Sequence, residues 1–376
     1  MKKSIPSFIS RTRISKLRGF SLIELMIGVA LGIFLVGGVI SLFTSNQQNF
    51  AVNDSLAKLQ ESARFAYEQM NREIRDAGTN PCGVRAVNTV VRRSDSSIPW
   101  WGDWDAGTLR GYDGNQTITG TTITFGSSVD NRITGTDAIV VMRTVNEDSL
   151  LRSVSLHSTA TSQITLNASA NFKKQDLMFM CDNVSGTIFE ITGATTATPP
   201  VLSYDASAPS ANCSNNLGWK SGVNCAANSI SKSFTTGSIV TKFDPSVWYV
   251  GIANDGSRAL FRETMHKDGS ANTITTERRE YVPDVHDMQI TYLMRTNPLA
   301  TDTLGIGVLD TAWVSASTID GQSGKWSSAN LKEAVAVRIE LTFKGKDKVG
   351  IEGQTSKVLE RKTVSVISLR NRELKR

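Results

Sequence analysis

The sequence predicts an α+β protein in which one long N-terminal helix packs on a β-rich globular head. An apolar run and then an apolar stripe with helical spacing occupy residues 20–77, whereas helical spacing is scarce after Gly78. The rest of the chain contains short segments in which apolar and polar side chains alternate, as in half-buried strands. The expected parts are a basic leader over 1–19, a hydrophobic helix over 20–43, an amphipathic helix over 44–78 and the head over 79–376.

Residues 20–43 form a run long enough to cross a membrane. The run contains 24 residues, and Glu24 is its only charged side chain. As a helix it reaches about 36 Å, compared with about 30 Å for a hydrocarbon core. A cleaved signal peptide is the alternative, but its apolar region is shorter, about 7–15 residues, and ends at a small-residue site. Gly28 and Gly32 have a spacing that lets membrane helices approach closely, although glycine is also common in such helices.

The positive charge of the chain lies before this run. Residues 1–19 contain six Lys or Arg residues and no Asp or Glu. Without these six, the 41 basic residues become 35 and equal the 35 acidic residues. The basic end is therefore expected in the cytoplasm, with the head across the membrane. A neutral head lacks the basic surface typical of DNA-binding proteins, so we predict no direct nucleic-acid binding.

The amphipathic helix is predicted from apolar residues that recur at steps of three and four. Gly78 and then Pro81 are natural stop signals after this stripe. One continuous helix over 20–77 would contain 58 residues. We interpret the stripe as core packing against a sheet rather than as a coiled coil. Its members are Leu56, Leu59, Ala63, Ala66, Met70, Ile74 and Ala77.

The head contains six strand candidates rich in β-branched and aromatic residues. In "AVAVRIELTF" the apolar side chains from Val335 to Phe343 occupy alternate positions, and Arg338, Glu340 and Thr342 lie between them. This alternation is typical of a half-buried strand. The other candidates are "DAIVVMRT", "DLMFMC", "SVWYVGI", "MQITYLM" and "TVSVISL".

Two segments of the head are expected to be loops. One is "PWWGDWDAGTLRGYDGN", and the other is about forty residues from Gly193 that are rich in Ser, Thr, Ala and Asn. For the aromatic residues of the first loop we favour an anchoring role on the protein's own core over a partner-binding surface. Its acids do not have the spacing of an EF-hand, so no metal site is predicted. These residues are Trp100, Trp101 and Trp104, and Asp103, Asp105 and Asp113.

The four cysteines all follow the apolar run, which indicates two disulfides in an oxidising compartment. Three pairings are open. We favour Cys213–Cys225, which closes a short loop and leaves Cys82–Cys181. None of the four belongs to a C-x-x-C pair, so zinc or redox chemistry is not expected.

The sequence contains no recognisable catalytic motif. The three histidines, His157, His266 and His286, do not form an H-E-x-x-H pair. "GIGVLD" lacks the third glycine of a dinucleotide fingerprint, and "IDGQSGKW" lacks two residues of a phosphate-binding loop. We expect neither enzymatic activity nor a cofactor.

The stretch "RGFSLIELMI", from Arg18 to Ile27, resembles the leader junction of type IV prepilins. In that family a prepilin peptidase cleaves after the glycine and methylates the new N-terminus. The resemblance implies cleavage between Gly19 and Phe20, removal of the leader, N-methylation of Phe20 and an assembly role for Glu24. It also implies the fold of a type IV pilin, with the long helix half embedded in the head.

The resemblance suggests why Glu24 is kept in an apolar run, where a carboxylate costs roughly 2.5–3.5 kcal/mol near the bilayer centre. Cleavage creates an α-amine on Phe20 that is protonated at neutral pH. In pilins the acid is thought to pair with this amine of a neighbouring subunit, so that two charges costly in lipid become tolerable together. The alternative is a Glu24 that is protonated and only tolerates the membrane.

Several segments of the head are similar to PilW-type minor pilins. They follow the order seen in that group, although "ITYLM" lacks a frequent Tyr-Gly pair and we interpret the Ser/Ala-rich segment as an insertion particular to this chain. The segments are "GTDAIVVMR", "DLMFMCDNVSGTIFEITG", "VWYVGIANDGSRALFRE", "VPDVHDMQITYLM", "LKEAVAVRIEL" and "VSVISLRNR".

This resemblance implies a minor pilin that primes type IV pilus assembly at or near the fibre tip. The implied partners are prepilin peptidase, other minor pilins, the major pilin, the inner-membrane assembly platform and a large tip adhesin. The protein would span the bacterial inner membrane once before assembly, with a periplasmic head, and lie in the surface pilus afterwards. Twitching motility and cell adhesion would follow from the fibre.

Two other functions remain open. A minor pseudopilin of type II secretion would share the same N-terminus and mechanism. A membrane-anchored adhesin or receptor would keep an uncleaved N-terminus.

Overall fold

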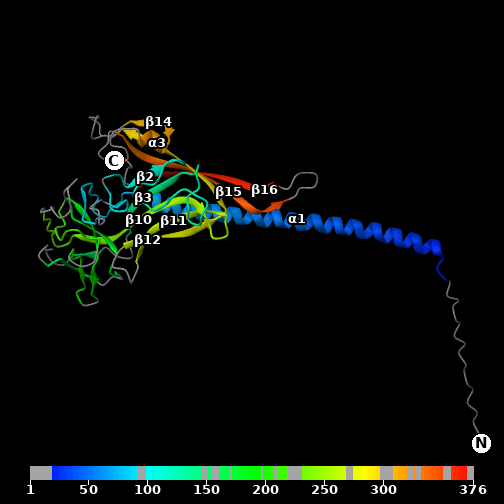
Figure 1. Ribbon diagram of the computed structural model, residues 1–376, viewed down its shortest axis with the longest axis horizontal. Coiled ribbons are helices and arrows are strands. Elements are labelled where there is room, and N and C mark those ends of the chain that lie inside the picture. Colours follow the sequence, from blue (N-terminus) through cyan, green and yellow to red (C-terminus); the bar gives the residue numbers. More distant parts are fainter. Residues whose placement is uncertain are drawn as a thin grey trace, which may run out of the picture. The chain divides into compact units, whose positions relative to one another are not determined.

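The computed structural model (Figure 1) divides the chain into two compact units. One unit is Met1–Asp54 with Val349–Ser356, and the other, which contains the β-sheets, is Ser55–Lys348 with Lys357–Arg376. The predicted leader, residues 1–19, lies outside the described residues apart from Gly19. The structure describes residues 19–91, 99–104, 106–145, 151–153, 161–168, 172–195, 198–206, 211–218, 231–267, 274–296, 308–320, 326, 332–349 and 357–370.

Helix α1 (Leu22–Arg75) contributes residues to both units. Its first backbone hydrogen bond runs from the amide of Leu25 to the carbonyl of Ser21, 3.1 Å. The segment within the first unit is the one helix in the described part of the chain that is long and apolar enough to cross a membrane. This agrees with the predicted span.

The second half of α1 buries one face in the head. This face follows the predicted stripe from Leu59 onward, but Leu56 is 37% exposed and the neighbouring Ser55 is buried instead. Glu73 is also buried, although the apolar pattern did not single it out. The buried residues are Ser55, Leu59, Ala63, Ala66, Met70, Glu73 and Ile74.

The helix ends at Arg75, shortly before the stop that the sequence predicts at Gly78. Gly78 has a φ of 73°, a left-handed conformation that favours glycine after a helix. Its amide donates to the carbonyl of Met142, 2.8 Å away in the head. This glycine therefore both ends the helix and connects it to a sheet.

The main sheet of the head has nine strands, and β10 lies at its centre. The path through the sheet is β1-β7-β6-β10-β11-β12, with β3 and β4 also paired to β10 and β2 paired to β3. Figure 1 shows β10, β11 and β12 side by side. The strands are β1 (Val87–Thr89), β2 (Leu109–Tyr112), β3 (Ala138–Val145), β4 (Leu151–Arg152), β6 (Leu177–Cys181), β7 (Gly186–Glu190), β10 (Ile239–Ile252), β11 (Arg258–Lys267) and β12 (Ile274–Pro283).

A second sheet has four strands in the order β14-β13-β15-β16. Asp284, with a φ of 63°, is the single residue between β12 and β13, so the chain passes directly from the first sheet to the second. On β15 the predicted apolar face is buried from Val337 to Phe343, and Val335 is half-buried. The strands are β13 (Val285–Thr296), β14 (Leu309–Val314), β15 (Lys332–Val349) and β16 (Lys357–Ser368).

The prediction that the segment from Gly193 is a loop is partly wrong, because this segment contains strands. Together with β5 (Gln163–Thr165), β8 (Gly193–Ala194) and β9 (Val201–Ser203) form a third sheet of order β5-β9-β8. Leu202, Tyr204 and Leu217 are buried there in a separate apolar cluster. The short alternation from Val201 to Tyr204 is hard to recognise within a Ser- and Thr-rich composition, which is why the strand was missed.

The first segment that was predicted to be a loop contains strand β2, so that prediction is also partly wrong, and its tryptophans lie in the core. Trp100, Trp101 and Trp104 are 4–8% exposed. The Trp104 ring centroid lies 5.7 Å from that of Phe179 and 6.2 Å from that of Phe243. The anchoring interpretation is therefore confirmed. After α1, the described residues include one further helix, α3 (Ala316–Asp320), so the class is α+β as predicted.

Candidate functional site

The residues of the predicted cleavage motif lie together at the start of α1. Gly19 and Phe20 precede the helix, and Glu24 lies in its first turn, where a carboxylate interacts favourably with the helix dipole. The side chain of Phe20 is 83% exposed. Within the described part of the single chain, Glu24 has no hydrogen bond or ion pair. Its carboxylate is available to a partner outside this chain.

The apolar side chains around this motif are exposed on every side of the helix. Each of the large ones between residues 20 and 43 is at least 55% exposed. Covering such side chains contributes roughly 1.5–3 kcal/mol apiece when burial is complete. In water this segment would be strongly unfavourable, so it requires a bilayer or other helices.

Packing among the described residues does not require the glycines of this segment. A Cβ added to Gly28, Gly32, Gly37 or Gly38 would meet no described atom within 4 Å. Since glycine also weakens a helix interior by roughly 0.5–1 kcal/mol relative to alanine, something other than internal packing accounts for it. Close approach of another helix is a physical reason for such small residues.

A buried charge network holds the last turns of α1 to the main sheet. Glu73 is 5% exposed and accepts five hydrogen bonds or ion-pair contacts. One carboxylate oxygen, Oε1, contacts Nη2 of Arg262 at 2.9 Å and Nη2 of Arg143 at 3.2 Å. The other, Oε2, accepts from Nε1 of Trp248 at 2.7 Å, Oγ of Ser246 at 2.9 Å and Nε of Arg262 at 3.2 Å.

Asp244 on β10 completes the network. Its Oδ2 lies 2.7 Å from Nη2 of Arg143 and 3.1 Å from Nη2 of Arg262. Two acids and two arginines therefore balance one another, which is the condition under which buried charges are tolerated. Burial disfavours the charge on Arg262, but Glu73 and Asp244 outweigh it and raise the pKa of Arg262 above its usual value.

The network was not found from the sequence, although one signal was available. Glu73 occupies a position on the apolar stripe between Met70 and Ile74, where a charged residue requires partners. The partners come from β3, β10 and β11, at separations of 70 to 189 residues. No local pattern relates them to the helix.

A disulfide fixes the segment that follows the helix. Cys82 and Cys181 are joined, with a Cα–Cα distance of 6.1 Å and a sequence separation of 99 residues. This pairing is one of the two favoured above. Cys213 is also disulfide-bonded, and Cys225, the partner favoured for it, lies outside the described residues.

The acids of the Trp-containing loop serve as backbone acceptors. The Asp113 carboxylate accepts from the amides of Ala316 and Ser317, at 2.9 and 3.0 Å, and so caps α3. Asp103 accepts from the amide of Ala106 at 3.1 Å, and Asp105 lies outside the described residues. Among the described residues, no group of three or more His, Cys, Asp or Glu side chains converges to hold a metal ion.

Asp137 and Glu190 are among the other carboxyl groups that are buried in the head. Burial raises the pKa of Asp137 to about 6 and that of Glu190 to about 7. Asp137 accepts from the amide of Ile290 at 2.7 Å, and Glu190 accepts from the amide of Ala211. Both groups connect segments far apart in the chain, which is a structural role.

No protein-family model, curated protein or solved structure matches the chain.

Proposed function

We propose that this protein is a minor pilin of the PilW type that takes part in type IV pilus biogenesis. One observation carries the proposal: a helix with an exposed apolar half begins at a prepilin-like junction, and its second half forms part of the core of a β-rich head. Anchoring in a membrane and packing in a fibre both require such an apolar half. The head provides the partner-specific surface.

The mechanism follows from the residues at the junction. Cleavage after Gly19 by prepilin peptidase gives Phe20 a charged α-amine beside an apolar helix. In the bilayer, Glu24 of one subunit and this amine of a neighbour reduce each other's desolvation cost when they pair. Pairing sets the axial register between subunits, while the apolar side chains that surround it move from lipid to helix contacts.

The proposed partners are those of a tip-initiating complex. They are prepilin peptidase, other minor pilins, the major pilin, the inner-membrane assembly platform and a large tip adhesin. Before assembly the protein would span the inner membrane once with its head in the periplasm, and afterwards it would be part of the surface pilus.

The head is suited to transmit force to the helix. Glu73 ties the helix to three strands through charge-assisted contacts, and Cys82 ties the following segment to β6. Pulling on the helix would have to break a buried charge network and then load a covalent crosslink. A subunit extracted from a membrane into a fibre experiences such a force.

Deletion of the gene tests the proposal. Surface pili and type II secretion are scored separately in the deletion strain and in the strain complemented with the wild-type gene. The proposal predicts loss of pili with normal secretion. Lost secretion with normal pili would indicate the pseudopilin, and normal pili with normal secretion would favour the anchored adhesin or receptor.

A further inference from the structure

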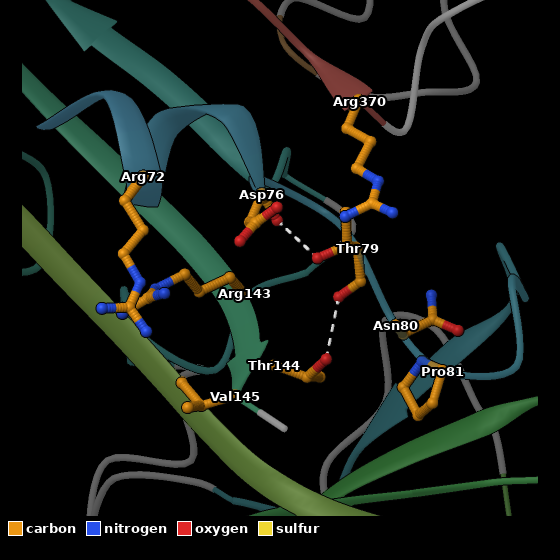
Figure 2. Close-up of a pocket in the computed structure, with 9 residues that line it drawn as sticks. All are labelled: Arg72, Asp76, Thr79, Asn80, Pro81, Arg143, Thr144, Val145 and Arg370. Atoms are coloured by element: carbon orange, nitrogen blue, oxygen red, sulfur yellow. Dashed lines mark hydrogen bonds between the residues drawn. The ribbon is translucent and has the colours of Figure 1, made fainter. Parts of the chain in front are cut away.

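A pocket rich in arginine lies at the end of α1 in the head (Figure 2). Its volume is about 450 Å³, within the range of about 300–1,000 Å³ common for sites of small molecules. Three arginines, Arg72, Arg143 and Arg370, and one acid, Asp76, line it. Figure 2 shows Arg72 and Arg143 on one side of Asp76 and Arg370 on the other.

The positive charge of this pocket is not balanced among the residues that the structure describes. Arg143 is committed through Nη2 to Glu73 and Asp244, whose network is neutral in itself. Arg72 and Arg370 have no hydrogen bond or ion pair among the described residues. Of the described residues, Asp76 is the one acid that lines the pocket, so two exposed guanidinium groups face one described carboxylate.

Arg143 also retains a donor that the fold does not use. Its side chain is 11% exposed, and its Nε atom is buried without a hydrogen-bond partner among the described residues. A buried donor without a partner costs about 1–3 kcal/mol.

The backbone around the pocket is held in place before any ligand arrives. Thr79 donates from Oγ1 to the carbonyl of Asp76 at 2.7 Å, and Thr144 donates from Oγ1 to the carbonyl of Thr79 at 3.1 Å (Figure 2). The Asn80 side chain exchanges two hydrogen bonds with the backbone of Val84, at 2.8 and 3.0 Å. A site with a fixed frame loses less entropy on binding.

We propose that this pocket binds a ligand with two or more carboxylate or phosphate groups, which Arg72 and Arg370 contact from opposite sides of the pocket. A guanidinium presents a planar fork of N–H donors that matches both groups, and it remains charged at all physiological pH values. The volume accommodates more than one such group. This inference concerns the head alone and holds whether or not the protein is a pilin.

Arg72 has a competing role that the test must separate. It lies in the last turn of α1, where a cation interacts favourably with the helix dipole. If Arg72 served only the helix dipole, its removal would lower the stability of the head without affecting anion binding. Arg370 lies outside α1 and has no such role. Removal of either arginine should therefore weaken anion binding only if the pocket is the binding site.

The experiment is isothermal titration calorimetry on the full-length protein in detergent, in a chloride buffer without phosphate. Citrate represents the carboxylate source and pyrophosphate the phosphate source, and the tighter of the two identifies the group. The proposal predicts saturable binding of at least one. Raising the salt from about 0.05 to 0.3 M should weaken that binding, because it screens the exposed charges.

Four variants make the result specific to the pocket. Arg72→Gln and Arg370→Gln should each weaken binding about tenfold or more, since each removes charge-assisted hydrogen bonds. Asp76→Asn should strengthen it several-fold, because a repelling carboxylate is removed while its backbone carbonyl still accepts from Thr79. Arg361→Gln is the matched control on β16, exposed and outside the pocket, and should change nothing.

Four results would overturn the proposal. They are the absence of binding of both anions to the native protein, unchanged binding by folded Arg72→Gln and Arg370→Gln variants, equal weakening by Arg361→Gln, and an Asp76→Asn variant that binds no more tightly than the native protein. Thermal unfolding of each variant shows whether the head is still folded. If Arg72→Gln does not fold, Arg370→Gln and Asp76→Asn still decide the matter through opposite changes in affinity.

Discussion

Replacement of Glu73 by glutamine should destabilise the head strongly. The side chain keeps its shape, but the network then contains two arginines and only one carboxylate, that of Asp244. Removing one partner of a buried ion pair costs about 3–5 kcal/mol, since it leaves an uncompensated charge. Glu73 makes five contacts and is 5% exposed, so it is a member of such a buried ion pair. We therefore expect the free energy of unfolding to fall by about 3 kcal/mol.

The measurement is urea unfolding of the full-length protein in detergent with its disulfides intact, followed by tryptophan fluorescence. Trp248, one of the seven tryptophans that contribute to this signal, donates to Glu73. Glu68→Gln is the matched control on the same helix. Glu68 is paired with Arg64 but is 54% exposed, so its loss should cost no more than about 0.5 kcal/mol.

A double substitution separates the charge effect from a general loss of packing. Arg262→Gln removes the cation that contacts both oxygens of Glu73. Glu73→Gln combined with Arg262→Gln restores neutrality, so the pair should cost less than the sum of the two single changes. Additive losses, or a Glu73→Gln loss no larger than that of Glu68→Gln, would refute the reasoning.

Three other substitutions test separate parts of the structure. Burial raises the pKa of Glu190 from 4.5 to about 7. Between these pH values the native state keeps a proton that the unfolded state has lost, so the free energy of unfolding falls as the pH rises from 4.5 to about 7. Glu190→Gln should therefore raise the free energy of unfolding at pH 8 by up to about 3 kcal/mol and have little effect at pH 4, measured by urea unfolding at both pH values; an equal effect at both would contradict this. Replacing Cys82 and Cys181 together by serine opens a loop of about a hundred residues and should cost about 4 kcal/mol, seen as a lower urea midpoint; an unchanged midpoint would show that the crosslink does not stabilise the head. Glu24→Ala should leave membrane insertion and cleavage intact but impair piliation, scored by electron microscopy, and normal piliation would remove the proposed role of the carboxylate.

The helix and the long strands are predictable from sequence because their signal is local. The stripe from Leu59 to Ile74 has the helical period, and the side chains of β15 from Val337 to Phe343 alternate. Each pattern reports which face is buried, and the structure buries those faces. The stop at Gly78 is local in the same sense, since a left-handed residue after a helix favours glycine.

The partners that these elements meet are not predictable in this way. Glu73 gives a single charge on an apolar stripe, and nothing nearby in the chain indicates Arg143 or Arg262. The pocket beside it combines the end of α1, the end of β3 and Arg370 near the C-terminus. Such sites arise from the sheet order, which no single segment encodes.

The segment after Gly193 shows a second reason why part of the fold could not be predicted from the sequence. Its composition is typical of a loop, yet Asn212 uses its side chain as a strand would use its backbone. Its Oδ1 accepts from the amide of Glu190 at 2.8 Å, and its Nδ2 donates to the carbonyl of Glu190 at 2.7 Å. A polar residue can therefore continue an edge pairing without any apolar alternation.

The N-terminus of the mature protein decides whether the chain is a processed prepilin. Mass spectrometry of the protein purified from membranes of its native host, or from sheared surface fibres, identifies the first residue and its modification. The proposed function predicts a chain that begins at N-methylated Phe20. A chain that still begins at Met1, or one that begins after residue 43, would contradict it.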